Sequence, residues 1–370
     1  MTLSPLAPAI RPSKPMRFHW SLSQVGDPFR RAAATRDMSG RIDLQCKIDF
    51  CQRAEQCGID SVLMAIGFTR PDPMLLSVAL GKETNTLKFM VACRAGLLSP
   101  TMFVQQINTV SSLLNGRVHI NMVCGHTPGE LRYYGDFLDH DARYERTDEF
   151  LTVCRSFWAD AGDVDFDGTY YQIKGGRLHT RFSPDPARGP EVYVGGNSGP
   201  AAALAAKHAH CWWRLAEPPA RVAASVGVVL DSGCEVGLLV SLIARPTHEE
   251  ARRAASALIG KFGDDAREVH RRFARGSDSV GFVSTYEAAT ADQEWLTPYL
   301  WTGAVPFLGA PAIALVGSNE EIAQALLDYN RIGVTQFLFT GWPDLDEMTS
   351  FSRHVLPRVR ELEGRDGDEH

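Results

Sequence analysis

Short apolar segments alternate with longer amphipathic segments along most of this chain, and this alternation constrains the fold more than any other feature. The short segments have the length and the Val, Ile and Leu content of buried parallel strands, and a helical pattern follows each one. The predicted strands are residues 16–22, 60–66, 87–94, 117–124, 191–194, 210–215, 235–244 and 334–340. Eight such units favour an α/β fold of the closed (β/α)8 type, the TIM barrel, with a doubly wound open sheet as the alternative.

Two segments interrupt the repeat within a single expected domain, residues 16–362. Near 164–190 an Asp-Gly pair between aromatic residues predicts a β-hairpin. Near 263–317 the chain is rich in charges and then in Pro, Gly and Trp, and we predict irregular structure there. Residues 1–15 are expected to be a disordered, Pro-rich leader, and the polar residues 363–370 a frayed tail.

Charge and cysteine usage exclude several classes of protein. The net charge is -6 and no Lys/Arg-rich block occurs, which argues against a nucleic-acid partner. No apolar run is long enough for a membrane span or a signal peptide. The eight cysteines include no Cys-x-x-Cys pair, so we expect reduced thiols in a cytoplasmic protein and no structural metal.

Polar residues gather at the end of the fourth predicted strand. Residues 117–124 alternate between apolar and polar side chains, and a Gly-His-Thr-Pro-Gly turn follows them. Ligands of parallel α/β folds bind at the carboxyl ends of the strands. Asn121, Cys124 and His126 are therefore candidates for the mouth of a binding site, although an ordinary strand and turn would read the same way.

A glycine-rich turn follows the fifth predicted strand. It reads Gly195-Gly196-Asn197-Ser198-Gly199, and a helical segment begins directly after it. Glycines let backbone N–H groups approach an anion closely, and the helix N-terminus and the Ser198 hydroxyl add favourable partners. The turn predicts a phosphate cradle of the barrel type; it is neither Gly-x-Gly-x-x-Gly nor a Walker loop.

Several segments taken together resemble a known family. The runs Leu114-Asn-Gly-Arg-Val-His-Ile-Asn-Met-Val-Cys-Gly125 and Asp139-His-Asp-Ala-Arg-Tyr-Glu145 carry most of the likeness. Further matches are Leu87–Arg94, Ser99–Thr101, Val194–Ser198, Glu217–Pro219, Ser277–Gly281, Ala314–Gly317 and Thr340–Pro343. The chain resembles the bacterial luciferase-like flavin-dependent monooxygenases, in particular the alkanesulfonate monooxygenases and their long-chain alkane and aminopolycarboxylate relatives.

The resemblance implies a specific chemistry. It implies a TIM barrel with insertion segments that uses FMN, reduced by a separate NAD(P)H:flavin reductase, together with O2. A flavin C4a-(hydro)peroxide would then oxygenate a small organic substrate by hydroxylation, heteroatom oxidation or Baeyer–Villiger chemistry. It also implies a homodimer or homotetramer, built on the helices that flank the early strands.

Residue by residue, the resemblance implies a set of flavin contacts. Where the family often has Thr, this chain has Cys124, which offers only a weak hydrogen bond. The implied cofactor-binding residues are Ala65, Cys93, Arg94, Asn121, Cys124, His126, Tyr144, Gly196, Asn197 and Ser198.

The substrate side departs from the sulfonate enzymes. A Cys, two Arg, a His and a Tyr surround the sulfonate in those proteins, and the matching positions here are Arg70, Leu239, Leu308, Ser241 and Trp342. A sulfonate needs a cationic clamp, and two Leu and a Ser cannot supply one. We therefore expect a larger, more apolar or aromatic substrate, with Trp20 as a further candidate for its pocket; Arg70 reads more simply as a solvated loop residue.

No residue stands out as an obligatory acid or base. His19 and His126 are the weak catalytic candidates, and His19 reads more simply as a core histidine. The polar loop 23–40 and the segment 263–309 are candidates for a lid. Three other functions stay open: a deazaflavin-dependent dehydrogenase of the same barrel family, a non-catalytic FMN-binding relative, and a flavin-free barrel enzyme that holds a phosphorylated substrate.

Overall fold

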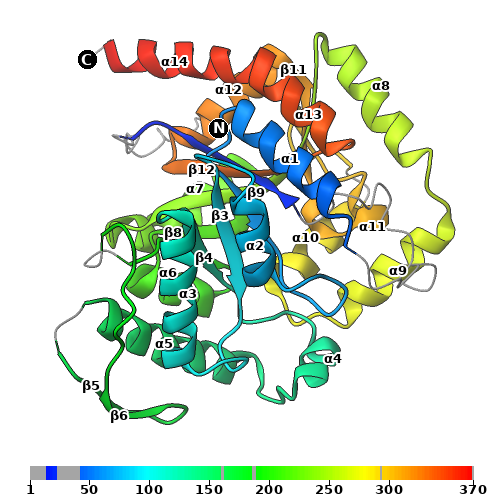
Figure 1. Ribbon diagram of the computed structural model, residues 1–370. Coiled ribbons are helices and arrows are strands. Elements are labelled where there is room, and N and C mark those ends of the chain that lie inside the picture. The colour runs from blue at the N-terminus through cyan, green and yellow to red at the C-terminus, as the bar shows by residue number, and fades with distance from the viewer. Residues whose placement is uncertain (1–13, 23–41, 160–161, 186–188, 292–293, 369–370) are drawn as a thin grey trace.

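Eight parallel strands close into a barrel in the computed structural model, which describes residues 14–22, 42–159, 162–185, 189–291 and 294–368 (Figure 1). The strands are β1 (Arg17–Ser21), β2 (Ser61–Met64), β3 (Lys88–Cys93), β4 (Val118–Met122), β7 (Val192–Gly195), β8 (Cys211–Leu215), β9 (Glu235–Arg245) and β12 (Val334–Thr340). Each pairs in parallel with the next, and β12 pairs with β1. The predicted TIM barrel is confirmed, and the open sheet is excluded because both edges of β1 are occupied.

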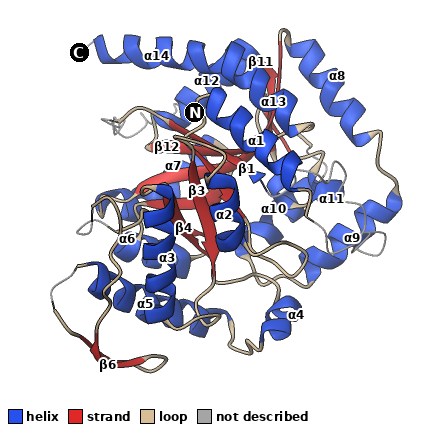
Figure 2. Cartoon of the chain, in the orientation of Figure 1, coloured by secondary structure: helices blue, strands red, loops and turns tan. Residues whose placement is uncertain are grey.

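Helices surround the barrel, as Figure 2 shows in blue around the red strands. They are α1 (Leu44–Gln56), α2 (Pro73–Gly81), α3 (Pro100–Leu114), α5 (His140–Trp158), α6 (Gly199–His208), α7 (Pro219–Asp231), α8 (His248–Ile259), α12 (Asn319–Asn330), α13 (Asp344–Ser350) and α14 (Leu356–Asp368). Side chains cap the first turns of several helices: Asp72, Ser99 and Asp139 each accept a hydrogen bond from the backbone N–H three residues ahead. The helix α14 runs to Asp368, past residue 363, where the frayed tail is predicted to begin.

The barrel interior is filled by alternate residues of the strands. Its central layer consists of Met90, Tyr193, Cys211, Trp213 and Leu338, all buried. Because side chains alternate along a strand, the neighbouring residues face the helices and build the larger outer core. The interior is therefore a packed core up to its carboxyl end, where the space above Trp213 opens.

The first insertion forms the predicted hairpin. Strands β5 (Val164–Asp167) and β6 (Gln172–Gly176) pair antiparallel and project from the barrel beside α5, at the lower left of Figure 1. The carboxylate of Glu149 accepts backbone N–H groups from Thr169 and Tyr170, at 2.7 and 2.8 Å. These bonds fix the hairpin turn on α5.

The second insertion is ordered, and the prediction of irregular structure there is wrong. It contains α9 (Asp264–Arg275), α10 (Val280–Thr290), β10 (Leu300–Trp301), α11 (Val305–Leu308) and β11 (Ala314–Ser318). The charges that suggested a loop lie on α9, an amphipathic helix, and Ser279 caps α10 by accepting the N–H of Phe282. The strand β11 pairs with the far end of β9, which is longer than its neighbours.

The predicted leader, up to residue 13, and the predicted lid loop 23–40 lie outside the described residues. Within the described part of the chain, no helix is long and apolar enough to cross a membrane.

Candidate active site

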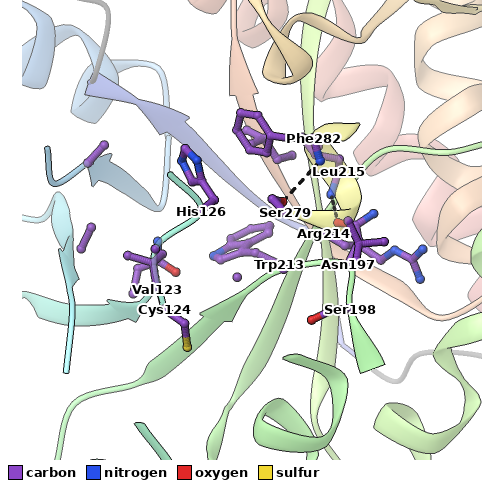
Figure 3. A pocket seen from close by; sticks show the side chains of 18 of the residues that line it. Val123, Cys124, His126, Asn197, Ser198, Trp213, Arg214, Leu215, Ser279 and Phe282 are labelled. Atoms are coloured by element: carbon purple, nitrogen blue, oxygen red, sulfur yellow. Dashed lines mark hydrogen bonds between the residues drawn. The ribbon is translucent and has the colours of Figure 1, made fainter. Parts of the chain in front are cut away.

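A cavity of about 240 Å³ opens at the carboxyl end of the barrel, between the strand ends and helix α10 (Figure 3). Its walls are mostly apolar side chains, with polar groups at the two sides. The lining residues are Leu63, Ala65, Ile66, Ala92, Arg94, Asn121, Val123, Cys124, Gly125, His126, His140, Tyr144, Gly195, Gly196, Asn197, Ser198, Trp213, Arg214, Leu215, Leu239, Ser279, Val280, Phe282 and Leu338.

The glycine-rich turn after β7 forms one side of this cavity. Gly196 has φ +144°, a backbone conformation that residues other than glycine rarely adopt. A Cβ added at this position would lie 2.9 Å from Ala201 Cβ and 3.0 Å from Tyr144 OH. Ser198 is the N-cap of α6: its hydroxyl accepts the N–H of Ala201 at 3.3 Å and donates to Tyr144 OH at 3.4 Å. The turn thus presents a helix N-terminus and two hydroxyl groups to the cavity.

Fixed contacts hold the turn in this position. The Asn197 side-chain oxygen accepts the N–H of Leu215 at 3.0 Å, and Trp212 Nε1 donates to the Gly196 carbonyl at 2.7 Å. Burial raises the pKa of the Tyr144 phenol well above its usual value, so this hydroxyl stays protonated. These contacts hold the turn in place before a ligand binds. The neutral phenol adds no negative charge that would repel an anion.

Unpaired polar atoms lie at the ends of β3 and β4, and β4 is the neighbour of β7 in the barrel. Arg94 is 8% exposed; its Nη2 contacts Glu130 Oε1 at 2.8 Å, while Nε and Nη1 are buried without a partner. The side-chain oxygen of Asn121 is also buried without a partner. A buried donor or acceptor without a partner costs about 1–3 kcal/mol, so these groups are suited to a polar ligand.

The end of β4 adds a thiol and an imidazole. Burial raises the pKa of Cys124 to about 12, and its Sγ lies 3.4 Å from the Thr147 hydroxyl, so it is a neutral thiol. The His126 ring stacks on Phe282 of α10, with centroids 4.5 Å apart and planes 17° apart. Figure 3 shows both side chains among those that line the cavity. Burial also lowers the pKa of His126, which favours the neutral ring.

Most of the predicted cofactor residues line this one cavity, and Cys93 does not. Its thiol faces away from the barrel, donates to the Val91 carbonyl at 3.2 Å, and borders a separate groove between α2 and α3. The residues on the cavity wall are Ala65, Arg94, Asn121, Cys124, His126, Tyr144, Gly196, Asn197 and Ser198.

Of the predicted substrate residues, Leu239 lines the cavity and the others lie elsewhere. Trp20 points outward from β1, where its Nε1 donates to Asp344 Oδ1 at 2.8 Å and its ring packs on Phe339. Ser241 is fully buried and bonded to the Thr340 hydroxyl. Leu308 and Trp342 pack in the apolar cluster around α8 and α11, and Arg70 lines a separate recess beside Lys47.

His19 lies below the cavity, within the barrel core. Its Nδ1 lies 2.7 Å from Ser61 Oγ and its Nε2 lies 3.0 Å from Gln336 Oε1. Burial lowers its pKa to about 3. Both nitrogens are occupied and the ring is neutral, so His19 reads as a structural core histidine.

The structure adds lining residues that the predicted cofactor and substrate sets do not include. His140 begins α5 and its ring lies 4.9 Å from that of Tyr144, beside the cradle. The two residues are four positions apart, which places both on one face of a helix, and this spacing is visible in the sequence. Ser279, Val280 and Phe282 come from the insertion, in the segment predicted as a candidate lid, but their contact with the barrel mouth is not visible in the sequence.

Comparison with known proteins agrees with this geometry. A family model for luciferase-like monooxygenases matches residues 16–336. The chain belongs to the luciferase-like monooxygenase family.

Solved structures of other proteins share the fold of this luciferase-like chain. A riboflavin lyase solved with modified FMN and riboflavin is 19% identical, with a TM-score of 0.75 over 95% of this chain and 92% of that one. A long-chain alkane monooxygenase is 18% identical, with a TM-score of 0.74 over 95% and 92%. An F420-dependent secondary alcohol dehydrogenase is 14% identical, with a TM-score of 0.65 over 94% and 100%. Within the described residues, no group of three or more His, Cys, Asp or Glu is placed to hold a metal ion.

Proposed function

We propose that this luciferase-like protein is a flavin-dependent monooxygenase that uses reduced FMN and O2 to oxygenate a small, mostly apolar organic molecule. The observation that carries the proposal is the Gly195–Ser198 turn, which opens onto the cavity at the N-terminus of α6. The wall formed by the ends of β3 and β4 in the same cavity holds buried polar atoms without partners. One elongated ligand with a phosphoryl end and a polar ring fits both features.

The cradle residues fit the phosphoryl group. A Cβ at Gly196 would clash with Ala201 and Tyr144, so glycine lets the turn pack closely beside them, and the turn would present the N-terminus of α6 to an anion. Ser198 and Tyr144 would donate hydroxyl hydrogen bonds, and His140 would add a ring N–H. The α6 N-terminus adds partial positive charge.

The wall at the ends of β3 and β4 fits the polar edge of a flavin ring. The free Nε and Nη1 of Arg94 are donors for a carbonyl oxygen, and the Asn121 oxygen is an acceptor for a ring N–H. When bound, reduced FMN would supply the activation of O2. The protein would hold the ring against the apolar floor formed by Trp213 and Leu338 and keep water from it.

The walls favour a substrate without a strongly anionic end. Leu239 lines the cavity where the sulfonate enzymes have a cation, and Arg94 is already paired with Glu130. The guanidinium of Arg214, on β8, is held by Glu217 and Ser225. An added sulfonate would therefore be poorly compensated, at a loss of several kcal/mol.

The family context supports three further proposals about the setting of the reaction. Reduced FMN would come from a separate NAD(P)H:flavin reductase, in the cytoplasm. Two copies of the chain would associate through the α2–α3 face, where Leu75, Met102 and Leu113 are exposed. No nucleic acid or membrane would take part.

Anaerobic titration with reduced FMN, oxidised FMN and reduced deazaflavin tests the proposal. A preference for reduced FMN, followed by O2 uptake on mixing with air, is the expected result. Preference for the deazaflavin, with no O2 uptake, would instead identify a dehydrogenase of the same barrel family. Tight FMN binding without O2 uptake would identify a non-catalytic flavin protein, and binding of neither would leave a flavin-free enzyme.

A further inference from the structure

One short segment joins the second insertion to the mouth of the barrel. Residues 277–279 connect α9 to α10, and they lie against the end of β4. The Ser277 hydroxyl and the Asp278 N–H both donate to the His126 carbonyl, at 2.8 and 3.1 Å. Ser279 ends this joint, and together with Val280 and Phe282 of α10 it forms the roof of the cavity.

A buried arginine of α5 fastens this joint. Arg143 is 1% exposed, and its guanidinium donates in three directions. Its Nε reaches the Cys124 carbonyl at 2.9 Å, Nη1 reaches the Leu138 carbonyl at 2.9 Å, and Nη2 reaches Asp278 Oδ2 at 2.5 Å. A planar guanidinium with several fixed donors can hold three segments at once, which a lysine cannot do.

The roof also contacts the cofactor side of the cavity. A Cβ added at Gly281 would lie 2.8 Å from the side chain of Asn197, so the first turn of α10 lies directly on the cradle. Phe282 stacks on His126 on the other side. The position of α10 therefore closes the cavity over both ends of a bound ligand.

We propose that Arg143, through its ion pair with Asp278, is a positioning residue that holds α10 closed over the cavity. Arg143 does not line the cavity; it acts through the joint at 277–279, which places the roof. Losing Asp278 leaves the buried guanidinium without its anionic partner, which is unfavourable enough to release the joint. Opening would be local to the first turn of α10, because the rest of the helix also packs on β8 and α11, and it would admit water to the reacting ring. The consequence for the reaction rests on the proposed function; the closure itself does not.

The substitution Asp278→Asn tests this in the full chain, because it preserves shape and removes the charge. Glu268→Gln is the matched control: it breaks exposed ion pairs with Arg271 and Arg272 in the same insertion, away from the joint. Hydrogen exchange of the amides of residues 279–290 is measured in the free protein. We expect exchange to rise about tenfold or more in Asp278→Asn, to stay unchanged in the control, and to stay unchanged for α5 in both.

Quenching of bound FMN fluorescence by iodide then tests the roof with ligand present. Asp278→Asn should bind FMN yet expose it to iodide, whereas wild type and Glu268→Gln should shield it. Equal exchange of α10 in Asp278→Asn and wild type, or an equal rise in the control, overturns the proposal. If wild type fails to bind FMN, the proposed function is wrong, and the exchange measurement still decides whether Arg143 holds α10.

Discussion

The substitution Ser198→Ala separates the two tasks of one hydroxyl, capping α6 and holding a phosphoryl group. The hydroxyl accepts the Ala201 N–H at 3.3 Å, and losing an N-cap of this kind lowers the free energy of unfolding by about 1 kcal/mol. A hydrogen bond to a charged group is worth about 1.5–3 kcal/mol. Losing that bond would weaken FMN binding about tenfold to a hundredfold.

A second serine of the same chain provides the control. Ser99 caps α3, accepts the Met102 N–H at 3.3 Å, and also precedes the helix that follows a barrel strand, but it does not line the cavity. Ser99→Ala should therefore lose a similar amount of stability in urea denaturation and keep wild-type FMN affinity in a fluorescence titration. FMN affinity unchanged in Ser198→Ala, or lowered equally in Ser99→Ala, would refute the assignment of the cradle.

Three other substitutions probe the same account. Tyr144→Phe removes a neutral hydrogen-bonding group, so FMN binding should weaken about twofold to tenfold while urea denaturation changes little; unchanged binding would remove Tyr144 from the cradle. Gly196→Ala forces a Cβ against Ala201 and Tyr144 and should abolish measurable FMN binding, whereas Gly233→Ala, also at positive φ but with open space around it, should cost stability and keep binding. Burial lowers the pKa of His119 to about 4 from 6.5, so between pH 6.5 and 4 the unfolded chain takes up a proton that the folded chain does not. The free energy of unfolding should therefore fall by up to about 1.4 kcal/mol per pH unit from this group as pH drops, and His119→Phe, measured by urea denaturation from pH 6.5 to 4.5, should show a shallower fall than wild type.

The barrel could be predicted because its signals are local. Each strand is a short apolar run, and capping residues such as Asp72 and Ser99 mark the helices that follow. The Gly195–Ser198 turn was recognisable for the same reason: its glycines and its hydroxyl are adjacent in sequence. The position of the cavity at the end of β4 agrees with the rule that parallel strands share one functional edge.

The rest of the site depends on facts that are not local. On β1, sequence alternation shows that His19 and Trp20 face opposite ways, but not which one faces the barrel axis; Trp20 faces the helices. The roof depends on contacts between residues more than a hundred positions apart, such as Arg143 with Asp278. The sequence resemblance also marked Ser241 as a pocket residue, while its bond to Thr340 buries it in the wall.

Comparing the binding of FMN and riboflavin tests the central claim most directly, because the two differ only in the phosphoryl group. The account predicts that FMN binds at least about tenfold more tightly, since the turn at Gly195–Ser198 and the N-terminus of α6 would contact that group alone. Equal affinities for the two flavins would contradict it.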